Sequence, residues 1–183
     1  MGSVRIVGGR WRGSRLPVPD APGLRPTSDR ARETLFNWLQ PWLPGARVLD
    51  LFAGSGALGF EAVSRGAAQA VLVERDAALA DALEASVRRL DAADSVQVVR
   101  ADALELLRAP LLGRFDGVFC DPPFEGGLWA TALQRLAPWL ADDAWLYVES
   151  PAAAPVEPDG EWRLHREGGT RDARHALYRR GAG

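Results

Sequence analysis

Two motifs about seventy residues apart hold the residue types with which this chain could do chemistry. Asp-Leu-Phe-Ala-Gly-Ser-Gly at 50–56 and Asp-Pro-Pro-Phe at 121–124 each follow an apolar run. Glycines in a turn carry no Cβ, so backbone can approach a nucleoside closely. A carboxylate and a prolyl carbonyl accept the hydrogens of an exocyclic amine, and an aromatic ring stacks on the base that carries it. Together the motifs indicate methylation of an amino group.

The second motif supplies the candidate acceptor residues Asp121, Pro122 and Phe124. Consecutive prolines lack N–H groups and hold an extended backbone, so the preceding strand must end there. A turn without function could use the same residues, but this one follows the strand expected beside the glycine-loop strand. Cys120 is the one cysteine and is interpreted as a small buried strand residue. It excludes an internal disulfide, and no metal site is expected.

The glycine loop leaves two cofactors in competition, because residues 54–59 also match the dinucleotide pattern G-x-G-x-x-G. Glu74, at the end of the next expected strand, would accept ribose hydroxyls in either kind of site. Asp50 distinguishes between the two cofactors. Four residues before the glycines, its carboxylate would lie near the cationic methionine end of S-adenosylmethionine, whereas it would repel a pyrophosphate. The loop therefore favours S-adenosylmethionine, with solvated strand ends as the alternative for both acids.

Asp102 is the third acidic candidate for the cofactor site. It follows the strand expected to end at Arg100, at the edge where doubly wound sheets bind their ligands. There it could accept a hydrogen bond from an adenine amino group. It could also cap the helix expected from Ala103, and one residue can serve both purposes.

Length and composition predict one domain over residues 1–183, with a basic hairpin and connection at 1–24 and a cofactor-binding core at 25–183. The chain is 47% hydrophobic, yet no window resembles a membrane span and no apolar block resembles a signal peptide. A cytoplasmic location and no membrane partner are therefore expected.

Charge is distributed unevenly along the chain. The first 32 residues hold seven arginines and two aspartates, a local charge of +5, while the whole chain has −2. Within this segment lie Arg10, Trp11, Arg12 and Arg15, a setting in which an aromatic ring could stack on an unpaired base while arginines hold phosphate. A plain solvated hairpin is the alternative. The absence of lysine reflects a GC-rich genome rather than function.

Strand and helix patterns alternate along the chain, which predicts an α/β fold with a parallel sheet covered on both faces. The two histidines, His165 and His175, fall on late strands, where surface or half-buried positions are expected. A hairpin turns around Gly8-Gly9, and the last two strands pair because no helix separates them. The expected strands are 4–7, 14–18, 47–52, 70–74, 96–100, 115–120, 144–149, 161–167 and 173–179, and the expected helices are 57–65, 77–90 and 129–140, with others starting near 28 and 103.

Four segments in this order resemble the bacterial 16S rRNA guanine-N2 methyltransferases of the RsmD type, over essentially the whole chain. They are residues 5–13 (Arg-Ile-Val-Gly-Gly-Arg-Trp-Arg-Gly), 25–37 (Arg-Pro-Thr-Ser-Asp-Arg-Ala-Arg-Glu-Thr-Leu-Phe-Asn), 50–56 and 121–124. The resemblance implies a Rossmann-like class I methyltransferase whose seven-stranded, mostly parallel sheet has an antiparallel last strand. It also implies S-adenosylmethionine as donor and a guanine of an assembled or partly assembled small ribosomal subunit as target. A monomer is expected.

The resemblance implies roles only for residues at positions that match the family's motifs. The acceptor site would be formed by Asp121, Pro122 and Phe124. The cofactor would be held by Asp50, Gly54, Gly56, Glu74 and Asp102, with Ala103 donating its backbone N–H to the adenine ring. Arg25 and Thr27 would lie near the methionine end or the target nucleotide. Arg25 joins Arg10, Trp11, Arg12 and Arg15 as expected RNA-binding residues.

Three other functions remain open from the sequence. A DNA adenine or cytosine amino methyltransferase shares both motifs but usually carries a target-recognition domain. A protein glutamine methyltransferase normally has Asn where Asp121 stands. A non-catalytic ribosome assembly factor would have no need of Asp121 and Glu74.

Overall fold

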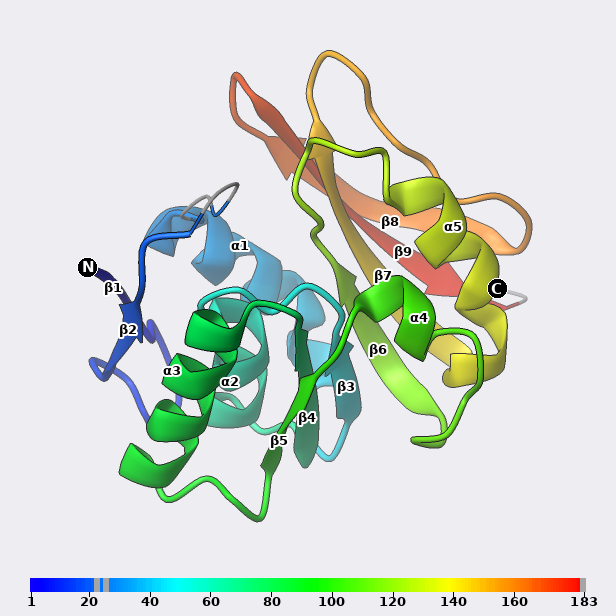
Figure 1. The fold of residues 1–183 in the computed structure, drawn as a ribbon. Helices are drawn as coiled ribbons and strands as arrows, with labels where there is room; N and C mark the ends of the chain where they lie inside the picture. Colours follow the sequence, from blue (N-terminus) through cyan, green and yellow to red (C-terminus); the bar gives the residue numbers. More distant parts are fainter. Residues whose placement is uncertain (22–23, 25–26, 182–183) are drawn as a thin grey trace.

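The computed structural model describes residues 1–21, 24 and 27–181 (Figure 1). Arg25 therefore lies outside the described residues. The strands are β1 (Gly2–Arg5), β2 (Arg15–Val18), β3 (Arg47–Asp50), β4 (Gln69–Glu74), β5 (Val96–Arg100), β6 (Phe115–Cys120), β7 (Leu140–Pro151), β8 (Trp162–Gly169) and β9 (Ala173–Arg180). The helices are α1 (Asp29–Leu39), α2 (Ala57–Ser64), α3 (Ala77–Arg89), α4 (Ala103–Leu106) and α5 (Trp129–Arg135), with 3-10 turns at Gln40–Trp42 and Ala137–Trp139.

Seven strands form the main sheet in the order β5-β4-β3-β6-β7-β9-β8. Strands β3 to β7 are parallel, whereas β9 is antiparallel to both of its neighbours. This confirms the predicted sheet and its antiparallel last strand. The order reverses between β3 and β6, so the carboxyl ends of these two strands flank the switch point at which open α/β sheets bind ligands.

Helices cover both faces of the sheet, as Figure 1 shows: α1, α2 and α3 lie on one face, and α4 and α5 on the other. Because both faces are covered, the central strands are apolar and buried on both sides. Helix α2 packs so closely on β4 that a Cβ at Gly59 would overlap the side chain of Leu72. The sheet and α2 therefore form a rigid support for the loops at the carboxyl edge.

The structure corrects several predicted details. The helix predicted to reach Leu140 ends at Arg135 and continues as a 3-10 turn, where Pro138 cannot supply a backbone N–H. Strand β7 is longer than predicted. His175 is buried, with 8% of its area exposed, where a surface or half-buried position was expected. The helix end has a local cause in Pro138, whereas the burial of His175 depends on neighbours that are distant in sequence.

Within the described residues, no helix is long and apolar enough to cross a membrane. The same residues contain no group of three or more His, Cys, Asp or Glu side chains that could hold a metal ion.

Candidate active site

A cavity of about 310 Å³ lies at the carboxyl ends of β3, β4, β5 and β6, over the switch point. This volume falls within the range of ligand pockets. Its lining brings together candidates from both motifs, which are more than sixty residues apart in sequence: Asp50, Gly54, Glu74, Asp102, Ala103, Asp121 and Pro122. Thr27 also lines the cavity, and its place near the methionine end or the target nucleotide stays a prediction. The expected cofactor and acceptor residues therefore share one space.

The glycine turn is held in shape by Glu74. One carboxylate oxygen accepts a hydrogen bond from the N–H of Gly54 at 2.9 Å, and the other accepts from the N–H of Asp76 at 2.9 Å. Gly54 has φ +55°, in the left-handed region that favours glycine. A carboxylate has about four acceptor positions, so Glu74 can hold the loop and still accept ribose hydroxyls from the cavity.

Two of the predicted cofactor and acceptor residues do not line the cavity. Gly56 caps α2 with φ +79°, and a Cβ there would lie 2.6 Å from Leu83 and 2.7 Å from Phe60. Its role in the structure is to let α2 start close to α3. Phe124 packs against Trp129, with ring centroids 5.9 Å apart. Contact of either residue with cofactor or base stays a prediction.

Asp50 lies at the floor of the cavity with 1% of its area exposed. Its carboxylate accepts from the N–H of Gly59 at 3.2 Å. Burial raises the pKa of Asp50 to about 7, the Gly59 bond opposes that rise, and the charge of Glu74 adds to it. A cation bound here would favour the ionised form. The donor set therefore fits the cationic methionine end of S-adenosylmethionine and disfavours a pyrophosphate.

Asp102 has the capping role considered from sequence. One of its oxygens accepts from the N–H groups of Leu104 and Glu105, at 2.9 and 3.1 Å, at the start of α4. Its other oxygen lies 3.9 Å from Arg75. Asp102 and Ala103 both line the cavity, so the two expected roles of Asp102 are compatible.

The acceptor motif follows β6 directly. Asp121 and Pro122 line the cavity, and Pro122 is buried. Cys120 is fully buried in β6, and burial raises the pKa of its thiol, with the Asp121 charge adding to the rise. A thiol held in its neutral form is a poor nucleophile, which confirms the structural interpretation of Cys120.

The basic N-terminal loop lies away from the cavity. The N–H groups of Arg10 and Trp11 donate to the carbonyl and hydroxyl oxygens of Ser64, the last residue of α2. The Trp11 ring packs edge-on against Phe60, and the Arg10 guanidinium lies 4.4 Å from the centroid of the Trp11 ring. The cavity is at the first turn of α2, roughly 11 Å away along the helix. RNA binding by Arg10, Trp11, Arg12 and Arg15 stays a prediction, but any contact would be remote from the methyl-transfer site.

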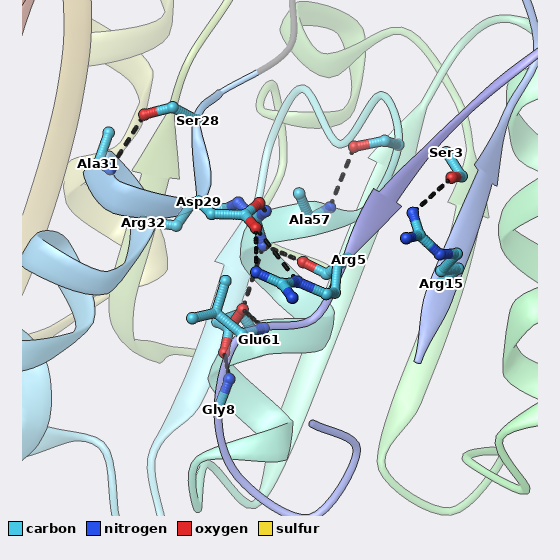
Figure 2. A network of polar contacts seen from close by, with 12 residues as sticks. Ser3, Arg5, Gly8, Arg15, Ser28, Asp29, Ala31, Arg32, Ala57 and Glu61 are labelled. Atoms are coloured by element: carbon cyan, nitrogen blue, oxygen red, sulfur yellow. Dashed lines mark hydrogen bonds and ion pairs between the residues drawn. The ribbon is translucent and has the colours of Figure 1, made fainter. Parts of the chain in front are cut away.

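A buried ion-pair network connects the N-terminal hairpin to α1 and α2 (Figure 2). Arg32 and Glu61 are both fully buried, with 3.2 Å between Nη1 and Oε1. Arg32 also donates to Asp29 at 2.6 Å and to the carbonyl of Arg5 at 2.7 Å. Glu61 accepts from the N–H groups of residues 7 and 8, both at 2.8 Å. Asp29 and Arg32 of the distinctive 25–37 segment therefore have a structural role.

From the sequence, Arg32 is one of the seven arginines of the basic N-terminal segment. Burial lowers the pKa of its guanidinium, whereas Glu61 and Asp29 raise it. A signal was present, because Arg32 stands at helical spacing from Leu35 and Leu39 on the apolar side of α1. A charged residue on that side needs a buried partner.

Comparisons with known proteins identify the family to which the chain belongs. A family model described as "Conserved hypothetical protein 95" matches residues 4–179. The chain belongs to this family. Among its relatives, Ribosomal RNA small subunit methyltransferase D of Escherichia coli (strain K12) is 48% identical, over 99% of this chain and 92% of the relative. The Haemophilus influenzae protein of the same name is 41% identical, over 97% of this chain and 94% of the relative.

A solved structure of the Escherichia coli methyltransferase yhhF superposes on the chain with a TM-score of 0.88 and 46% identity, covering 100% of both chains. The match includes both sides of the cavity. As a member of the Conserved hypothetical protein 95 family, the chain is an S-adenosylmethionine-dependent methyltransferase.

Proposed function

We propose that this protein methylates the exocyclic N2 amine of a guanine in the 16S rRNA of the small ribosomal subunit. The observation that carries the proposal is the single cavity that joins the carboxylates Asp50 and Glu74 to the acceptor pair Asp121 and Pro122. The names of the relatives, which are rRNA small subunit methyltransferases, support the substrate class.

The acceptor residues would orient the target amine for attack on the methyl group. Its lone pair is delocalised into the guanine ring, so the nitrogen is a weak nucleophile. Asp121 and the carbonyl of Pro122 accept its hydrogens and favour a pyramidal nitrogen aimed into the cavity. S-adenosylmethionine, when bound, supplies a methyl group already activated by the sulfonium. Because no further activation is needed, holding the two reactants in line provides most of the rate.

The cofactor-side residues would bind the cofactor and take no part in bond making or breaking. Glu74 would accept the ribose hydroxyls, and Asp50 would stabilise positive charge at the methionine end. Asp121 or water takes the proton that leaves the amine. Asp121 thus has two candidate roles, as an orienting acceptor and as a base.

The partner would be an assembled or partly assembled small subunit rather than bare RNA. The chain has a net charge of −2, so long-range attraction to phosphate is weak and a preformed surface would provide the specificity. Within this proposal, the protein acts as a monomer in the cytoplasm.

Mass spectrometry of nucleosides from 16S rRNA tests the proposal. A strain lacking this protein is expected to lose one N2-methylguanosine, and purified protein with S-adenosylmethionine is expected to restore it on small subunits from that strain. An unchanged N2-methylguanosine content in the deletion strain would show that the guanine of 16S rRNA is not the substrate.

A further inference from the structure

Three ionisable residues, Asp121, Glu149 and His175, stand at one level of the sheet, where β6 ends and the acceptor motif begins. Cys120, the last residue of β6, pairs with Val148 of β7, so Asp121 leaves β6 at the position where β7 continues with Glu149. Glu149 in turn pairs directly with His175 of β9. Alternate strand residues share a face, and Phe119 and Tyr147, two positions earlier, have their rings 6.2 Å apart on the face covered by α1. Glu149 and His175 therefore occupy this face, and Asp121 follows Phe119 at the same two-residue spacing just beyond the end of β6.

Glu149 is a buried carboxylate, with 5% of its area exposed. Its Oε2 accepts a hydrogen bond from the Tyr147 hydroxyl at 3.2 Å, and its Oε1 lies 3.8 Å from Nε2 of His175. Burying a carboxylate is costly unless it is paired and hydrogen-bonded. Two polar partners on neighbouring strand positions satisfy that need. Glu149, Tyr147 and His175 thus occupy core positions of β7 and β9, where apolar side chains would carry no desolvation cost.

Glu149 is also attached to the far end of the acceptor loop. Its carbonyl accepts a hydrogen bond from the indole N–H of Trp129 at 2.9 Å. Trp129 is the first residue of α5, and its ring packs against Phe124. The loop that starts at Asp121 beside the Glu149 side chain thus ends on the Glu149 backbone.

We propose that Glu149, held by Tyr147 and His175, is a positioning residue for methyl transfer that acts through Asp121. Its backbone fixes the end of the acceptor loop, and its negative charge acts on the neighbouring carboxylate. The inference rests on the proposed function, in which Asp121 receives the amine hydrogens.

The charge of Glu149 has a defined consequence. A like charge nearby disfavours ionisation, so Glu149 makes Asp121 a stronger proton acceptor. Among described residues, the titratable groups that the sheet register brings to Glu149 are Asp121, which follows β6, Tyr147 on its own strand and His175 on β9. Asp50 on β3 lies level with Phe119, two positions earlier. Removing the Glu149 charge should therefore lower the pH at which the reaction is lost on acidification.

Glu149→Gln is the direct test, because the amide keeps the shape and can still accept from Tyr147. Single-turnover methylation of small subunits from the deletion strain would be followed from pH 5 to 9 at saturating S-adenosylmethionine. The expected result is a roughly 10- to 100-fold slower reaction at pH 7. The acid limb of the profile is expected to move down by about one unit, with the Kd of S-adenosylmethionine unchanged within about twofold. Glu149→Asp, which keeps the charge, should restore the position of the limb.

Glu167→Gln is the matched control, since this residue lies on β8 with an exposed side chain paired to Arg174. Tyr147→Phe serves if Glu149→Gln folds poorly, and should give a smaller change in the same direction. Wild-type rate and profile in Glu149→Gln would overturn the inference. The inference would also be overturned if Glu149→Gln slowed the reaction without moving the acid limb, and if the lower rate were explained by weaker cofactor binding or a lower Tm. Failure of the wild-type protein to methylate the subunits would instead reject the proposed function.

Discussion

The two sides of the cavity are built in different ways. On the cofactor side, Asp50, Glu74 and Asp102 each accept hydrogen bonds from backbone N–H groups of nearby loops or helices. The carboxylates that we propose as cofactor ligands thus also shape the loops. On the acceptor side, two prolines supply no N–H, and the loop is anchored from outside, through the bond from Trp129 to Glu149.

This difference has a consequence for substitution. A change in a cofactor-side carboxylate alters the shape of its loop and the binding of the ligand together. A change at Asp121 removes chemistry while the prolines and Trp129 still hold the loop. Rate and affinity should therefore separate cleanly on the acceptor side and not on the cofactor side.

The largest expected effect is at Asp121. Asp121→Ala should slow single-turnover methylation by roughly 10²- to 10⁴-fold, the range for one positioned proton-accepting group. Binding of S-adenosylmethionine and Tm should be preserved. Asp121→Asn can still accept a hydrogen bond, so substantial residual activity would identify an orienting role, and a loss equal to that of Ala would identify charge or proton acceptance. Near wild-type turnover in both variants would remove Asp121 from the mechanism.

Glu74→Gln should weaken binding of S-adenosylmethionine by about 10- to 100-fold, because hydrogen bonds to a charged group contribute roughly 1.5–3 kcal/mol. Thermal shift provides the measurement: the wild-type protein gains about 2.7 kcal/mol of stability at a ligand concentration of 100 times Kd, and the variant should gain less. NAD should stabilise neither protein. If NAD stabilises the wild type and S-adenosylmethionine does not, the dinucleotide interpretation of the glycine loop returns.

Asp50 should make cofactor affinity depend on pH. Its pKa is raised to about 7, so below pH 7 the empty site holds it protonated. A cationic ligand favours the ionised form, so binding releases a proton in this range, and affinity rises with pH by at most about tenfold per unit before levelling above pH 8. Calorimetry in buffers of different ionisation enthalpy measures the proton. Asp50→Asn should abolish the dependence, and its persistence in that variant would assign it to another group.

The smallest effect on the chemistry is expected from the N-terminal arginines. Replacing Arg10, Arg12 and Arg15 together should weaken binding to the small subunit and reduce the salt slope by about one unit for each lost phosphate contact. Because their loop lies at the far end of α2, cofactor affinity and the single-turnover rate at saturation should not move. Unchanged affinity and slope would show that this loop has a purely structural role.

The sequence predicted the sheet, the position of β6 and the cavity-lining carboxylates, because each depends on local signals. Apolar runs set the strands, and a turn of glycines or prolines after a strand sets the site. Three features depend on partners that local signals do not identify. The helical spacing of Arg32 indicated the apolar side of α1 but not its partner Glu61, His175 lies beside Glu149, and Gly56 lies close to Leu83. Each is decided by a residue distant in sequence.

The Arg32–Glu61 pair also bears on the order in which the chain is assembled. Glu61 accepts from the backbone of residues 7 and 8, so the hairpin acquires its anchor only after α2 has been synthesised. Closing a loop of that length costs only slightly more than closing a shorter one. Until then the opening basic segment is held to the rest of the chain by little more than α1. The hairpin and α2 should therefore become protected from amide hydrogen exchange together, as one cooperative unit.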